Sequence, residues 1–115
     1  MREIRFRAWD KVAIEMKEVT FVDHYLPYPS RFEIMQYTGL KDKNGKEIYE
    51  SDLVKYLGKI WQIEWMWCGF VLMEPGNAFN AIILATKPMK MWEEILEVIG
   101  NIYESPHLLD NNSGL

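Results

Sequence analysis

The sequence predicts an all-β fold, mainly antiparallel, in the form of a compact bent sheet or a small SH3-like barrel with one or two short helical turns. Two observations lead to this prediction. Apolar and polar side chains alternate with a period of two over several short segments, as they do in strands that are buried on one face. Asn44-Gly45 lies between two extended segments, and this dipeptide is a strong short-range signal for a β-hairpin.

The first fifty residues are expected to form a strand pair together with the Asn44-Gly45 hairpin. Strands are predicted at residues 4–9, 19–22 and 32–37, where apolar side chains alternate with polar ones or are β-branched. Residues 23–30 contain two prolines and are expected to form a loop.

Residues 51–109 are expected to form a barrel-like half. Gly58, Gly69 and Gly76 mark turns between extended segments. The strands predicted there cover residues 53–56, 60–66, 70–73, 81–86 and 96–103. A short helical turn is expected over Met89–Ile95, and another after Ser105-Pro106. Residues 1–109 are therefore predicted to form a single domain, followed by a flexible tail at 110–115.

Composition and charge exclude several classes of protein. The chain has 115 residues, 49% of them apolar, which is enough for one hydrophobic core and is not typical of a disordered protein. Its formal net charge of −4 argues against a strongly basic nucleic-acid coat. One cysteine, Cys68, excludes an internal disulfide and a cysteine-based zinc cluster. Without a secretory signal or a long apolar run, a cytoplasmic location and no membrane contact are expected.

The residues suited to catalysis or metal binding form no recognisable constellation. His24 and His107 are far apart in the sequence, and Cys68 has no neighbouring base. Acidic side chains cluster at residues 47–52 and 93–97, where a solvated face is the simpler interpretation. No catalytic residue, metal ligand or cofactor is predicted, and a metal-dependent hydrolase or nuclease is only a third hypothesis.

The tryptophans of one predicted strand are the most informative feature of the sequence. Trp61, Trp65 and Trp67 share one parity with Ile63, whereas Gln62 and Glu64 have the other. We expect the three tryptophans to be core aromatics that pack against Ile4, Phe6, Val98 and Ile102. The alternatives are a subunit interface or a platform on which single-stranded nucleic acid stacks.

Three motifs in order resemble the YopX family of phage and prophage proteins. They are Arg2–Asp10, Met35–Glu50 and Glu97–Glu104, and the resemblance extends over residues 1–109. One position differs, because the family usually has glycine where this chain has Ser51. If that glycine serves a positive φ, then Ser51 strains the turn; otherwise the turn never needed glycine. The resemblance implies a small, mostly β protein of the bacterial host cytoplasm with no established activity and no catalytic residues to transfer.

The leading hypothesis is therefore a non-catalytic phage accessory protein that contacts a host or phage protein. The alternative is a nucleic-acid-binding module in phage replication or gene expression. A possible interaction surface is formed by the cations Arg5, Arg7, Lys41, Lys43 and Lys46. Self-association is also expected, because apolar surface and exposed strand edges can pair between copies.

Overall fold

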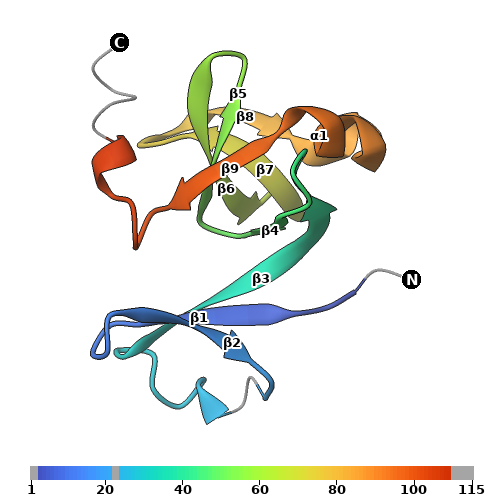
Figure 1. Ribbon diagram of the computed structural model, residues 1–115. Coiled ribbons are helices and arrows are strands. Elements are labelled where there is room, and N and C mark those ends of the chain that lie inside the picture. The colour runs from blue at the N-terminus through green and yellow to red at the C-terminus, as the bar shows by residue number, and fades with distance from the viewer. Residues whose placement is uncertain (1–2, 22–23, 110–115) are drawn as a thin grey trace.

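A computed structural model describes residues 3–21 and 24–109, and it confirms the predicted all-β, antiparallel fold. The described chain forms two sheets, with strand orders β2-β1-β3-β4 and β8-β7-β6-β5-β9 (Figure 1). The strands are β1 (Phe6–Asp10), β2 (Glu15–Val19), β3 (Phe32–Lys41), β4 (Glu47–Tyr49), β5 (Asp52–Tyr56), β6 (Lys59–Met66), β7 (Gly69–Glu74), β8 (Asn77–Ile83) and β9 (Glu97–Asn101). The helical elements are the 3-10 turn η2 (Leu84–Thr86) and the helix α1 (Met89–Ile95).

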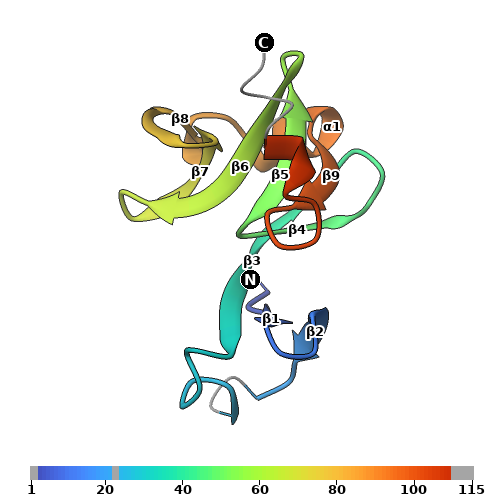
Figure 2. The same cartoon turned by 90° about the vertical axis from the view of Figure 1, so that its left-hand side faces the viewer.

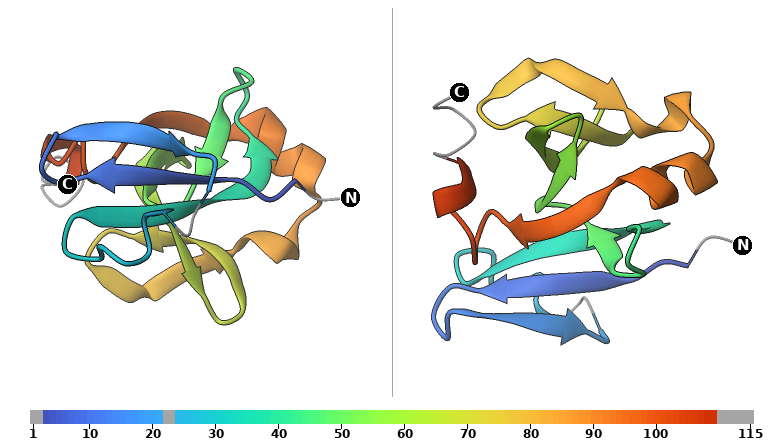
Figure 3. Two further views of the ribbon diagram at one scale, coloured as in Figure 1. Left: turned by 90° about the horizontal axis from the view of Figure 1, so that it is seen from below. Right: turned by 45° about the horizontal axis from the view of Figure 1, so that its top comes forward.

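The first sheet takes its strands from the first fifty residues, and β2, β1 and β3 lie side by side in it (Figure 3). The second strand begins at Glu15, so the prediction of a strand at 19–22 was wrong, and Val22 lies outside the described residues. The second strand begins earlier than predicted because the turn after β1 is short. The Asp10 carboxylate accepts hydrogen bonds from the backbone N–H groups of Val12 and Ala13, both at 3.0 Å, and the chain reverses there.

Asp10 is fully buried and collects several cationic partners. Its carboxylate accepts hydrogen bonds from Arg31 Nε and Nη2, both at 3.1 Å, and lies 3.2 Å from Lys17 Nζ. The hydrogen bonds from Arg31, followed by that from Ala13, hold the pKa of the Asp10 carboxyl well below its usual range. The first sheet is thus tied to the loop that precedes β3 by an ionised, buried carboxylate.

Because the Asp10 carboxylate is buried and ionised, we expect the folded protein to lose stability in acid. An unfolded chain protonates Asp10 near the ordinary aspartate pKa of about 4, whereas the folded chain keeps it ionised to lower pH. The stability contributed by Asp10 is therefore complete above about pH 4 and decreases as the pH falls further, towards the folded pKa. Urea unfolding from pH 6 to pH 3 should show wild type and Asp10→Asn converging below pH 4. A constant difference between the two over this range would contradict the role of Asp10.

The second sheet bends around the main hydrophobic core, which α1 closes (Figure 2). Alternate residues of β6 and β7 point into this core, among them Trp61, Ile63 and Leu72. The burial predicted for Trp61 is confirmed, since it is only 5% exposed, and Val98 packs against the same cluster. The helical turn predicted at Met89–Ile95 is α1, and it buries Trp92 in this core.

The prediction that Trp65 and Trp67 are buried was wrong, because they are 49% and 62% exposed. Trp65 pairs with Phe70 at the end of the sheet, where Phe70 takes the buried position and the Trp65 ring packs edge-on against it at 4.8 Å. Trp67 lies beyond β6, in the turn to β7, where strand parity no longer applies.

The contacts expected from the first strand were also wrong. Ile4 precedes β1 and is 64% exposed. Phe6 pairs with Val19 and Gln36 in the first sheet and is not a member of the Trp61 cluster; neither is Ile102.

Strand β3 joins the two sheets. Its beginning pairs with β1, and its end, at Leu40, enters the core of the second half together with Ile48 of β4 (Figure 1). The predicted Asn44-Gly45 hairpin is confirmed, with Gly45 at φ 84°. Ser51 adopts φ 70°, so the turn before β5 does need the left-handed conformation that glycine favours.

Candidate interaction surface

A stretch of the second sheet is almost free of charge. Residues 65–86 carry one charged side chain, Glu74, although charged residues make up 26% of the whole chain. This stretch forms the end of β6, then β7, β8 and η2. It exposes four large apolar side chains, namely Trp65, Trp67, Phe79 and Ile83. Depletion of charge together with exposed aromatic side chains is typical of the centre of a protein interface.

The turn between β6 and β7 holds Trp67 and Cys68 in an unusual backbone conformation. Met66 pairs with Gly69, so the loop has only two residues. Both have positive φ, 55° for Trp67 and 62° for Cys68, as a type I′ turn requires. Such turns usually contain Asn-Gly, because a left-handed non-glycine residue costs about 1–2 kcal/mol. The fold therefore presents Trp67 on a strained turn.

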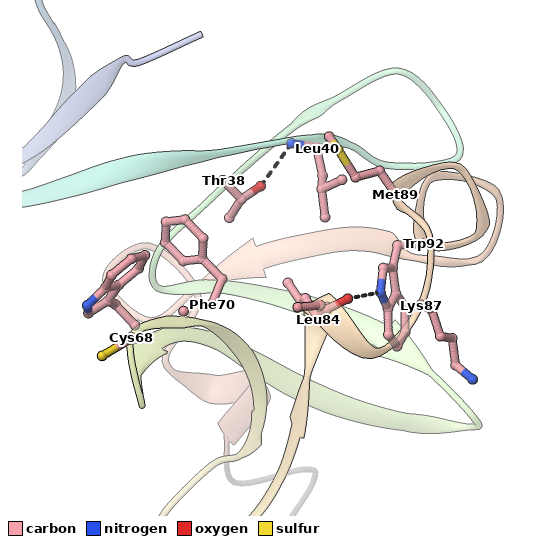
Figure 4. A pocket seen from close by; sticks show the side chains of 11 residues that line it. Thr38, Leu40, Cys68, Phe70, Leu84, Lys87, Met89 and Trp92 are labelled. Atoms are coloured by element: carbon pink, nitrogen blue, oxygen red, sulfur yellow. Dashed lines mark hydrogen bonds between the residues drawn. The ribbon is translucent and has the colours of Figure 1, made fainter. Parts of the chain in front are cut away.

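An apolar pocket with a volume of about 260 Å³ opens beside this turn (Figure 4). Cys68 and Phe70 line one side of it, and Leu84 and Trp92 line another. Trp65 is also a lining residue. The remaining lining residues are Thr38, Leu40, Gly69, Ala85, Lys87 and Met89. The pocket thus lies where the β6–β7 hairpin, η2, α1 and the end of β3 meet.

Two polar groups that line the pocket already have hydrogen-bond partners. Thr38 Oγ1 donates a hydrogen bond to the Ile48 carbonyl at 2.8 Å and accepts one from the Leu40 N–H at 3.1 Å. Trp92 Nε1 donates to the Leu84 carbonyl at 2.6 Å. Lys87, the one charged lining residue, places Nζ 5.9 Å from the centre of the Trp92 ring. An apolar occupant therefore suits this pocket better than a polar one.

The predicted cationic surface is partly engaged within the protein. Arg7 is only 13% exposed, and its Nη2 lies 2.7 Å from Asp52, while its guanidinium covers the Tyr49 ring at 4.7 Å. Arg5 pairs with Glu3 and Glu47. Lys43 Nζ is 3.6 Å from Glu97. Lys41 and Lys46 are exposed, on β3 and in the β3–β4 turn. Arg7 therefore links the two sheets, and the proposal of a cationic binding surface depends mainly on Lys41 and Lys46.

The acidic cluster at residues 47–52 is built into the fold. Asp52 accepts hydrogen bonds from Arg7 and from the Tyr49 N–H, and burial raises its pKa against the opposing effect of Arg7. Glu50 accepts a hydrogen bond from the Gln36 N–H at 2.9 Å, and burial, helped by the nearby charge of Glu64, raises its pKa. These carboxylates join β1, β3 and β5, which gives them a structural role.

Two other features bear on chemistry. Within residues 3–21 and 24–109, no three His, Cys, Asp or Glu side chains are grouped so that they could hold a metal ion. In the same part of the chain, no helix has the length and apolarity needed to cross a membrane.

Sequence reasoning missed the pocket and Phe79. Phe79 is 99% exposed, and Met89 and Trp92 come from a helix assigned only by its spacing. A count of charges along the chain would have found part of the site, because residues 65–86 stand out by that measure alone.

Comparison with known proteins places this chain in a family. The crystal structure of protein EF1440 from Enterococcus faecalis is similar, with 26% sequence identity, a TM-score of 0.68, and coverage of 95% of this chain and 99% of that one. Among curated proteins, none matches the sequence. The family described as YopX protein matches residues 17–110, most of the chain, although the Arg2–Asp10 motif lies outside this match. The chain belongs to the YopX protein family.

Proposed function

We propose that this protein is a non-catalytic accessory protein of a phage or prophage, and that it acts by binding another protein. Its binding site is the uncharged surface, defined as Trp65, Trp67, Phe79 and Ile83. Trp65 lines the apolar pocket, and Phe79 lies towards the other end of β7. One observation carries the proposal: large apolar side chains are exposed along residues 65–86, where Glu74 is the single charge, and Trp65 among them borders an open apolar pocket. The phage context is supported by the resemblance of the three sequence motifs to phage and prophage proteins.

The composition of this surface fits a protein partner. Tryptophan is enriched among the residues that dominate binding energy, especially in well-packed pockets that lose their water on binding. Methionine adapts its shape to different apolar partners, and Met89 lines this pocket. The pocket can take one apolar side chain of the partner while Trp65 and Trp67 cover the residues around it.

Nucleic-acid binding is the competing function, because exposed Trp65 and Trp67 are also able to stack on bases. Phosphate contacts need free cations, but Arg5, Arg7 and Lys43 are paired with carboxylates. Binding to single-stranded DNA or RNA would weaken steeply with salt, whereas binding through an apolar surface would change little.

The β6–β7 turn provides a test that separates binding from stability. Replacing Trp67-Cys68 by Asn-Gly gives this two-residue turn its preferred sequence and removes the exposed tryptophan. We expect the double variant to be more stable by about 1 kcal/mol, because relief of left-handed strain exceeds the loss of a mostly exposed side chain. Its melting temperature should rise by about 4 °C, and it should lose the partner.

The measurement is capture of proteins from a host lysate, at low and high salt, with a Lys41→Gln/Lys46→Gln variant as the control. A protein that wild type and the control retain at both salt concentrations, and the Asn-Gly variant does not, supports the proposal. Loss of binding in the lysine control alone, with steep salt dependence, would favour nucleic acid instead. Equal retention by all three proteins would show that the uncharged surface is not the binding site.

A further inference from the structure

The β7–β8 hairpin holds one aromatic ring entirely in solvent. Phe79 is 99% exposed, so its side chain contributes almost nothing to the core. The hairpin is nevertheless ordered by its own hydrogen bonds. Asn77 Oδ1 accepts one from the Phe79 N–H at 3.1 Å, and Asn80 Nδ2 donates one to Glu74 Oε2 at 2.7 Å.

A bulge in the ladder directs this ring outward. Met73 pairs with Ala81 and the next residue, Glu74, pairs with Asn77, so β8 has three extra residues, 78–80, between these two pairs. Phe79 lies at the middle of that extra stretch. It is therefore a projecting apolar group on a defined support.

The pocket beside Trp65 is suited to receive such a ring. Its volume is about 260 Å³, and an apolar protein cavity of about 150 Å³ already binds benzene. Two of its hydrogen-bonding atoms, Thr38 Oγ1 and Trp92 Nε1, are engaged with backbone groups of the same chain. A benzyl ring would leave none of these atoms without a partner.

We infer that the pocket is filled by a second copy of this chain, with Phe79 of one copy inserted beside Trp65, Leu84 and Met89 of another. This inference rests on the proposed function, and it identifies a second copy of this chain as one protein that binds at the pocket. The projecting ring and the receiving pocket occur once in every copy, so one kind of contact satisfies both.

The charges around the two elements also favour this pairing. Residues 75–86, which contain the hairpin turn, β8 and η2, have no charged side chain, and Glu74 at the end of β7 is held by its hydrogen bond to Asn80. The segment around Phe79 therefore brings no charge of its own into the apolar pocket, and each copy's net charge of −4 arises from residues outside residues 75–86. The Phe79 side chain and the pocket are different patches of the surface. A closed assembly is therefore either a twofold dimer with two equivalent contacts or a cyclic oligomer.

Sedimentation equilibrium measures this association, with variants that remove either element. Wild type should exceed the monomer mass of 13.7 kDa as its concentration rises. Phe79→Ser removes the ring, and Ala85→Trp fills the pocket from an exposed position on its rim. Each should weaken self-association at least tenfold. The matched controls Phe21→Ser and Ala13→Trp alter exposed residues of the first half and should behave as wild type.

Mixing the two variants gives the decisive measurement. Ala85→Trp retains the projecting ring and Phe79→Ser retains the open pocket, so each associates weakly alone but an equimolar mixture should form a 1:1 complex. Melting curves like that of wild type establish that both variants are folded. The inference is wrong if wild type stays monomeric, if Phe79→Ser associates as wild type does, or if the mixture stays monomeric. None of these outcomes alters the lysate test with the Asn-Gly variant, so the proposed function is judged separately.

Discussion

Replacing Trp92 by alanine should unfold the protein or lower its melting temperature sharply. Trp92 is 1% exposed, its ring packs edge-on against Tyr56 at 5.4 Å, and its Nε1 donates a hydrogen bond to the Leu84 carbonyl. Truncation of a buried tryptophan costs about 3–5 kcal/mol, which is a large part of the stability of a small domain. It would also remove the shorter of two hydrogen bonds to the Leu84 carbonyl, which would keep only that from the Lys87 N–H at 3.4 Å.

The matched control is Trp65→Ala, which removes the same side chain from a half-exposed position at the end of β6. We expect it to cost about 1 kcal/mol, because much of the ring is already in water. Urea unfolding followed by circular dichroism measures both variants. Equal loss of stability in the two would place Trp65 in the core and contradict the structure.

This contrast shows which parts of the fold the sequence could predict. Period-two alternation in β6 correctly placed Trp61 and Ile63 inside, because their cross-strand neighbours are buried too. The same alternation wrongly predicted burial of Trp65 and Trp67. Alternation shows which face of a strand a side chain is on, but not how far along the strand the hydrophobic core extends. The tight turn at Trp67-Cys68 could not be predicted either, since its residues lack the Asn-Gly signal that identified the β3–β4 turn.

Helix α1 was predicted at its observed bounds from the spacing of Met89, Trp92 and Leu96. Its importance was not predictable from that spacing, because the position of Trp92 against Leu84 depends on how η2 packs. The candidate site has the same origin. Phe79, the β6–β7 turn and α1 are separated in sequence, and only the charge-poor composition of residues 65–86 pointed to part of it.

The cationic surface shows a different limit. Arg7 looked like a free cation because its strand neighbours alternate, but it lies against Asp52, 45 residues away. Opposite charges that meet across sheets leave no local pattern. Sequence alone therefore overstated the positive charge that is available to a ligand.

Loss of Asp42 should be the other large effect on stability. This residue is 4% exposed and lies at the start of the β3–β4 turn. Its Oδ1 accepts hydrogen bonds from the N–H groups of Asn44 at 2.9 Å and Lys46 at 2.8 Å. Its Oδ2 accepts one from the Val98 N–H of β9 at 2.9 Å. One carboxylate thus shapes the hairpin and fastens it to the edge of the second sheet.

Asp42→Ala should cost at least about 4 kcal/mol, because three N–H groups lose a charged acceptor and hydrogen bonds of this kind contribute about 1.5–3 kcal/mol each. Asp42→Asn separates the two functions of this side chain. Its single carbonyl oxygen can still accept from Asn44 and Lys46, but its amide N–H₂ cannot accept from Val98. We expect Asp42→Asn to retain the hairpin, with an intermediate loss of stability and faster hydrogen exchange at the Val98 amide. Unchanged exchange at Val98 in a folded Asp42→Asn protein would show that the Val98 N–H does not depend on Asp42.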